Sequence, residues 1–131
     1  MLQIQEWLGK EVYTLAIPQI QNSGSKYLYH IRMCRCTISE IGIRDEDISE
    51  NNYQSLHSRI SFRLRNQKTG GKLTAGLCED GRILCNYRQV GIPIEAFTTK
   101  EQARAAAGKL KERAEGSYKN AIIEIDFDSF N

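Results

Sequence analysis

From Arg59 to Asn66 the chain alternates between polar and apolar side chains, and this pattern constrains the fold more than any other segment. Successive side chains of a β-strand point to opposite faces, so apolar residues at every second position share one face. The segment is therefore predicted to be a half-buried strand. Its buried face carries Ile60, Phe62 and Leu64, and its outer face carries Arg59, Ser61, Arg63 and Arg65.

Two glycine turns follow this strand. Thr69-Gly70-Gly71 supplies the positive φ angles of a hairpin turn, and Asp80-Gly81 is a favoured pair for a two-residue hairpin loop. The region from Arg59 to Arg88 is therefore predicted to be a three-stranded antiparallel meander. A two-residue loop at Asp80-Gly81 pairs Leu77 with Leu84.

A helix is predicted after the meander. Thr98 can cap a backbone amide, and Glu101, three residues later, completes a capping box. Gly116 offers the stop. The helix carries an apolar stripe, made mostly of Ala, which permits close approach to a sheet, so the helix is expected to lie across the meander. The stripe consists of Ala103, Ala106, Ala107, Leu110 and Ala114.

Further strands are predicted at 11–17, at 26–38 and at 121–127, the last followed by a frayed tail. The acidic segment Asp45-Glu46-Asp47 is predicted to be a loop. Together these elements predict a single α+β domain over residues 1–131. Its antiparallel sheet of about five to six strands packs against one main C-terminal helix.

The start of the chain lacks a secretory signal pattern, and no eighteen apolar residues run together, so neither export by that route nor a membrane span is predicted. The four cysteines are interpreted as reduced thiols of a cytoplasmic protein. The net charge of +2 is unevenly distributed. Residues 59–92 hold seven basic and two acidic residues, whereas residues 37–52 hold one basic and five acidic residues.

The sequence carries no recognisable catalytic signature, and it predicts no cofactor and no metal. Cys34 and Cys36 are separated by one residue, and Cys78 and Cys85 by six, whereas zinc ribbons place two residues between ligands. Neither His30 nor His57 lies beside a nucleophile and a carboxylate in sequence. The remaining enzymatic alternative is a metal-dependent nuclease or small hydrolase that uses Asp126 and Asp128, at the end of the last predicted strand.

The outer face of the meander is the candidate functional surface. The planar fork of Arg donates two parallel hydrogen bonds to phosphates or guanine edges, and a β-ribbon can enter a DNA major groove. The alternative is that exposed strands carry basic residues for solubility. The candidate nucleic-acid-binding residues are Arg59, Arg63, Arg65, Lys68, Arg82 and Arg88.

The segment Phe97-Thr98-Thr99-Lys100-Glu101-Gln102-Ala103-Arg104-Ala105-Ala106, with the strand pattern of 121–127 after it, carries a resemblance. Residues 59–127 resemble the three-strand-plus-helix DNA-binding modules of plant ethylene-response factors and of tyrosine-recombinase arm-binding domains. The resemblance implies that the sheet reads the major groove, with Arg59, Arg63, Arg65, Arg82 and Arg88 near DNA. The strands lack the Trp of that family, and Ala105-Ala106-Ala107-Gly108 replaces its Tyr-Asp-containing segment.

Two functions follow as hypotheses. The first is a non-enzymatic nucleic-acid-binding or nucleic-acid-associated accessory protein that uses the Arg-rich sheet face. The second is a protein-interaction module, such as a subunit, adaptor or small inhibitor, which docks a charged partner through its uneven charge. Homodimerisation through an exposed strand edge is left open by the sequence.

Overall fold

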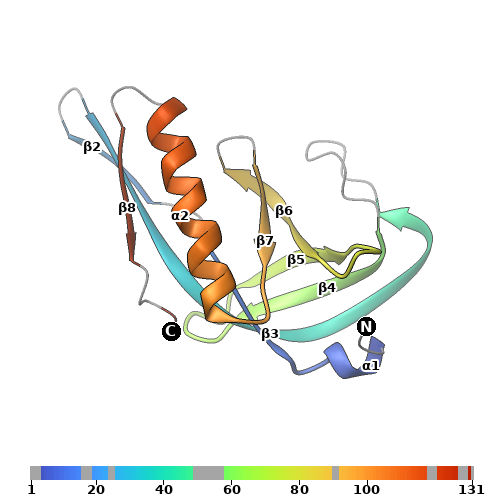
Figure 1. The fold of residues 1–131 in the computed structure, drawn as a ribbon. Coiled ribbons are helices and arrows are strands. Elements are labelled where there is room, and N and C mark those ends of the chain that lie inside the picture. Colours follow the sequence, from blue (N-terminus) through green and yellow to red (C-terminus); the bar gives the residue numbers. More distant parts are fainter. Residues whose placement is uncertain are drawn as a thin grey trace.

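Two helices and eight strands make up the part of the chain that the structure describes. This computed structural model describes residues 4–15, 19–23, 26–48, 58–89, 92–117, 121–126 and 130. The elements in chain order, drawn in Figure 1, are α1 Ile4–Trp7, β1 Glu11–Leu15, β2 Gln19–Ser23, β3 Lys26–Ile48, β4 Ser58–Asn66, β5 Lys72–Leu77, β6 Ile83–Gln89, β7 Ile92–Ala96, α2 Lys100–Ser117 and β8 Ala121–Asp126.

Strand β3, with 23 residues, belongs to two groups of strands. Its first part pairs with β2 and β8, and its second part pairs with β1 and β4. From there the order β1-β3-β4-β5-β6-β7 continues through antiparallel pairs, whereas β8 runs parallel to β3. Figure 1 shows β3 as a long curved ribbon that crosses the molecule from the β2 and β8 end to β4.

The mixed α and β composition and the one long helix near the C-terminus are confirmed, but the predicted sheet is incomplete. The described residues form eight strands where about five to six were predicted, and the pairing is not wholly antiparallel. The short strands β2 and β7 were missed because neither alternates clearly, and Pro93 argues against a strand in β7. The acidic segment 45–47, predicted to be a loop, continues β3.

Strands β1 and β7 close the six-strand path into a barrel-like sheet. Tyr13 and Phe97 exchange two backbone hydrogen bonds, with N to O distances of 2.7 and 2.8 Å. The hydroxyl of Thr14, which is 2% exposed, donates to the carbonyl oxygen of Glu95 at 3.0 Å. This seam pairs backbone groups that an open sheet leaves unpaired at its two edges.

The interior of the barrel-like sheet is filled from every strand around it. Phe62 and Leu64 of β4 are almost completely buried, as the alternation predicted, and they lie in one apolar cluster with Val12 of β1 and Ile38 of β3. Trp7 of α1 packs on the Phe62 ring at a centroid distance of 5.5 Å. The buried Cys34, Cys36 and Cys85 belong to the same cluster.

Helix α2 buries the predicted stripe except for Ala106, which is half-buried, and the helix lies elsewhere than predicted. Ala103, Ala107, Leu110 and Ala114 are buried, and the helix packs on β8 and β1 rather than across the meander. Figure 1 shows it beside β8, over the first part of β3. The reason is that Ile123 of β8 and Ile31 of β3 offer a second apolar face, outside the meander.

The cap of α2 and the tail after β8 also differ from prediction. The cap is Thr99, one residue later than expected: its Oγ1 accepts from the Gln102 amide at 3.2 Å and donates to Gln102 Oε1 at 3.1 Å. Phe130, in the tail predicted to be frayed, is 4% exposed. It packs edge-on against Tyr13 at a centroid distance of 5.3 Å, beneath Lys100 and Arg104 of α2.

The β5–β6 hairpin has a three-residue loop in place of the predicted two-residue loop. The Gly81 amide donates to the Cys78 carbonyl oxygen at 3.0 Å, and Gly81 adopts a φ of 89°. A turn followed by a left-handed residue is the usual three-residue connection. The longer loop shifts the register by one residue, so that Leu77 faces Ile83 and not Leu84, and both face the interior.

Replacing Thr14 by Val tests the seam. The change keeps the side-chain shape but leaves the partly buried Glu95 carbonyl without its hydroxyl donor, so we expect the free energy of unfolding to fall by about 1–2 kcal/mol. Urea denaturation measures it. The control is Thr74→Val, at a half-buried β5 position, for which we expect a change within about 0.5 kcal/mol. Equal effects of the two substitutions would contradict a role for Thr14 in closure.

Candidate functional site

The outer face of β4 carries the Arg residues that the alternation placed there. Arg59, Arg63 and Arg65 are exposed, while Phe62 and Leu64 between them are buried. Alternate residues of a strand lie about 7 Å apart, so Arg63 and Arg65 present two neighbouring guanidinium groups on one side of the sheet. The predicted outward position of these three Arg residues is therefore confirmed.

Strands β3 and β5 flank this row and complete a three-strand surface. Arg65 lies opposite Thr37 of β3 and Lys72 of β5. Arg63 lies opposite Glu40 of β3 and Thr74 of β5. Directly paired residues point to the same face of a sheet, so these side chains form one surface. We call it the β3–β5 face, made of Thr37, Glu40, Arg63, Arg65, Lys72 and Thr74.

The one acidic residue of the β3–β5 face is neutralised within it. Lys72 Nζ donates to Glu40 Oε1 at 3.1 Å, and this hydrogen bond lowers the pKa of the Glu40 carboxyl, with the Lys72 charge adding to the effect. Arg63 and Arg65 form no ion pair with the described residues. The face therefore presents Arg63 and Arg65 without an ion pair among the described residues, although the Arg63 charge also contributes to the lowered pKa of Glu40.

The β4–β5 turn holds Lys68 at one end of this face. Asn66 Oδ1 accepts from the backbone amides of Lys68 and Thr69 at 2.9 and 3.2 Å, and Gly70 adopts a φ of 76°. The Lys68 backbone is therefore fixed while the residue remains exposed.

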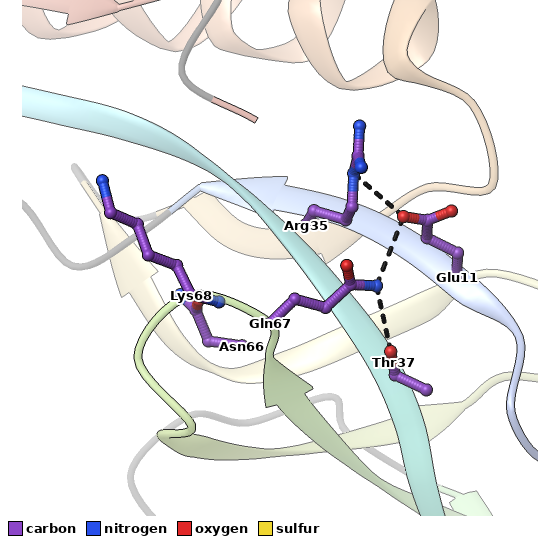
Figure 2. Close-up of polar contacts among 6 residues, drawn as sticks. All are labelled: Glu11, Arg35, Thr37, Asn66, Gln67 and Lys68. Carbon is purple, nitrogen blue, oxygen red and sulfur yellow. Dashed lines mark hydrogen bonds and ion pairs between the residues drawn. The ribbon is translucent and has the colours of Figure 1, made fainter. Parts of the chain in front are cut away.

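Gln67 ties the same turn to β1 and β3. Figure 2 shows its side chain reaching from the turn, with Nε2 donating to Glu11 Oε1 at 3.2 Å and to Thr37 Oγ1 at 3.0 Å. Glu11 of β1 also forms an ion pair with Arg35 of β3, with 2.9 Å between Glu11 Oε1 and Arg35 Nε. These contacts set the edge of the β3–β5 face by side-chain bonds between three segments of the chain.

Arg82 and Arg88 stand apart from this row. Arg82 follows the β5–β6 loop, where its Nε donates to Asp80 Oδ2 at 2.7 Å, a bond that raises the pKa of Arg82. The backbone amide of Arg82 and that Nε group together lower the pKa of Asp80. Arg88 is in β6 with its backbone opposite Pro93, and its side chain lies outside the described residues.

Sequence reasoning missed Arg35 and Lys72 as parts of this region. Lys72 lies in the same row as Arg65, and Arg35 approaches the turn through Glu11. The alternation of polar and apolar side chains in β5 indicates only weakly that Lys72 lies on this face. The position of Arg35 depends on the pairing of β3 with β1, which no local pattern indicates.

The thiols do not gather into a metal centre. The described residues hold no group of three or more His, Cys, Asp or Glu side chains that could bind a metal ion. Burial raises the pKa of both Cys36 and Cys85 to about 12. His30 Nδ1 lies 3.8 Å from Glu124 Oε2, and Asp126 is exposed at the end of β8. His57 and Asp128 lie outside the described residues, and so do the side chains of residues 45–47.

Comparison of the chain with protein-family models, with curated proteins and with solved structures finds no match. Within the described ranges, the search for membrane-spanning helices finds none of sufficient length and apolar character. The site is therefore interpreted from its own geometry.

Alkylation of the folded protein tests the thiol environments. At pH 8 we expect iodoacetamide to modify the half-buried Cys78 first and to leave Cys36 and Cys85 unmodified, since a pKa of about 12 leaves only about one thiolate in ten thousand at that pH. Peptide mass spectrometry reads the sites, and protein unfolded in guanidinium is the control in which all four react. Modification of Cys36 or Cys85 as fast as Cys78 in the folded protein would contradict this burial.

Proposed function

We propose that this protein is a non-enzymatic nucleic-acid-binding or nucleic-acid-associated accessory protein, and that the β3–β5 face makes the phosphate contacts. The observation that carries the proposal is the adjacent pair Arg63 and Arg65, both exposed and without an ion pair among the described residues. Arg59 lies at one end of the same strand, and Lys68 lies in the turn that follows its other end.

The chemistry of this face suits phosphate groups. The Arg fork donates parallel hydrogen bonds to phosphate oxygens, and release of counterions from the nucleic acid adds a favourable, salt-dependent term. Lys72 holds Glu40 and so reduces the repulsion that a carboxylate would exert on a polyanion. Backbone hydrogen bonds to β3 and β5 hold β4 on both sides, so the Arg row is presented on a rigid element.

The remaining predicted residues have a secondary place in the proposal. The Arg82 side chain already donates a hydrogen bond to Asp80. Arg82 can therefore contact a phosphate only if that bond is shared with the phosphate or replaced by it. Arg88 and the resemblance to the ethylene-response-factor and arm-binding modules stay predictions. The proposal covers phosphate contact by the β4 row and leaves the type of nucleic acid to the titration below.

The double substitution Arg63→Ala and Arg65→Ala tests this function. If the nucleic acid contacts one phosphate through each side chain, the substitution should weaken binding to double-stranded DNA, single-stranded DNA or RNA. The slope of log affinity against log salt is negative, and the substitution should reduce its magnitude by about two. Fluorescence-anisotropy titration with each labelled oligonucleotide at two salt concentrations measures both quantities.

A matched control removes the same charge from another surface. Lys111→Ala with Arg113→Ala takes two positive charges from α2, where Lys111 makes only a 3.8 Å surface pair with Glu115. We expect this variant to keep nearly all of the affinity and slope. Equal losses of affinity in both variants would show that binding depends on net charge and not on the β3–β5 face. If the unmodified protein binds none of the three nucleic acids at low salt, a co-purifying protein partner becomes the next hypothesis to pursue.

A further inference from the structure

A cavity of about 220 Å³ lies between α2 and the seam of the sheet. Its walls come from β1, from β7 and the residue after it, and from one side of α2. Most of the wall is apolar, contributed by Leu15, Ile94, Phe97, Ala103, Ala106 and Leu110. Residues of both α2 and β7 line this space, although the helix makes its main contacts with β8 and β1. The cavity lies in this partly filled space.

The alanines of α2 keep this space open. Ala103 and Ala106 both line the cavity, and a larger side chain at Ala106 would project into it. The space is partly open to solvent, so a ligand can reach it from outside. A cavity of this size can hold a small organic molecule, since benzene occupies an apolar cavity of about 150 Å³ in another protein.

The acidic residue Glu95 lies on the wall of this apolar space, and its carboxylate has no hydrogen-bond or ion-pair partner among the described residues. Glu95 is half-buried. Its backbone is fixed, because the carbonyl oxygen accepts from Thr14 and the residue pairs with Leu84 of β6. Burial raises the pKa of the Glu95 carboxyl; the Arg82 charge opposes this rise and the Asp80 charge adds to it.

The neighbouring charges do not supply the missing partner. Arg82 is near enough to act on Glu95 electrostatically, but its Nε is bound to Asp80. Lys109 also lines the cavity, on the exposed side of α2, and forms no ion pair with Glu95. A half-buried carboxylate in apolar surroundings is stabilised by a cation or a strong hydrogen-bond donor, so charge complementarity favours a ligand that brings one.

We propose that this cavity is a binding site for a small apolar amine, with its hydrocarbon part among Leu15, Phe97 and Leu110 and its ammonium group on Glu95. The site is distinct from the β3–β5 face and does not depend on its function. The volume limits the ligand to about the size of an aralkyl amine, because the usual pockets for drug-sized molecules begin near 300 Å³.

Calorimetric titration with three probes of similar size tests the proposal. Phenethylamine carries an ammonium group, phenethyl alcohol a neutral hydroxyl, and hydrocinnamate a carboxylate. We expect the amine to bind at least about tenfold more tightly than the alcohol, because a charge-assisted hydrogen bond is worth more than a neutral one. We expect the carboxylate to bind most weakly.

Two variants and one control assign that binding to the cavity. Glu95→Gln keeps the side-chain shape and should abolish the preference for the amine over the alcohol. Ala106→Leu should fill the space and abolish binding of both, while Lys109→Ala should leave amine binding intact or tighter. Circular dichroism confirms that each variant is folded.

The proposal is overturned if no probe binds, if the alcohol binds as tightly as the amine, or if hydrocinnamate binds best through Lys109. It is also overturned if Glu95→Gln keeps the amine preference. If Ala106→Leu does not fold, the Glu95→Gln comparison alone decides the question, since this substitution neither adds bulk nor removes a described hydrogen bond.

Discussion

Two reciprocal hydrogen bonds between Tyr13 and Phe97 join the first strand of the six-strand path to the residue just after the last, and the rest of the structure depends on this seam. The partly buried hydrogen bond from Thr14 to Glu95, two residues 81 positions apart in the chain, reinforces the seam. Closure gives every strand of the path an interior and an exterior side. The same alternation that sends Phe62 and Leu64 inward therefore sends Arg63 and Arg65 outward.

The seam also explains where the helix and the cavity lie. Because β3 is long enough to leave the barrel-like part, its first segment forms a second surface with β2 and β8. Met33 and Cys34, adjacent in sequence and on opposite faces, are both buried, since the strand is covered on both sides at this point. Helix α2 covers the β8 side and meets β7 incompletely, which leaves the space that Glu95 faces.

The sequence predicted what local patterns determine. The β4 alternation, the helix over most of its length and the β8 pattern each depend on neighbours in sequence, and each is present. The register of the β5–β6 hairpin was wrong because Asp80-Gly81 fits both a two-residue and a three-residue loop. The parallel β8, the seam and the position of α2 are long-range pairings that no short segment encodes.

The same division holds for the candidate site. The positions of Arg59, Arg63, Arg65 and Lys68 followed from one strand and its turn. Their neighbours Thr37, Glu40 and Lys72 required the pairing of three strands, and Glu95 in its cavity required the packing of α2 against the seam. Charge counts along the chain could show a basic region but could not show that Lys72 neutralises Glu40 within it.

The most direct measurement is a map of backbone amide shifts in ¹⁵N-labelled protein as an oligonucleotide is added at low salt. We expect the largest shifts on the β3–β5 face, at Thr37, Arg63, Arg65 and Lys72, and small changes along α2. Shifts confined to α2, or spread evenly over the surface, would contradict the assignment of this face as the nucleic-acid interface.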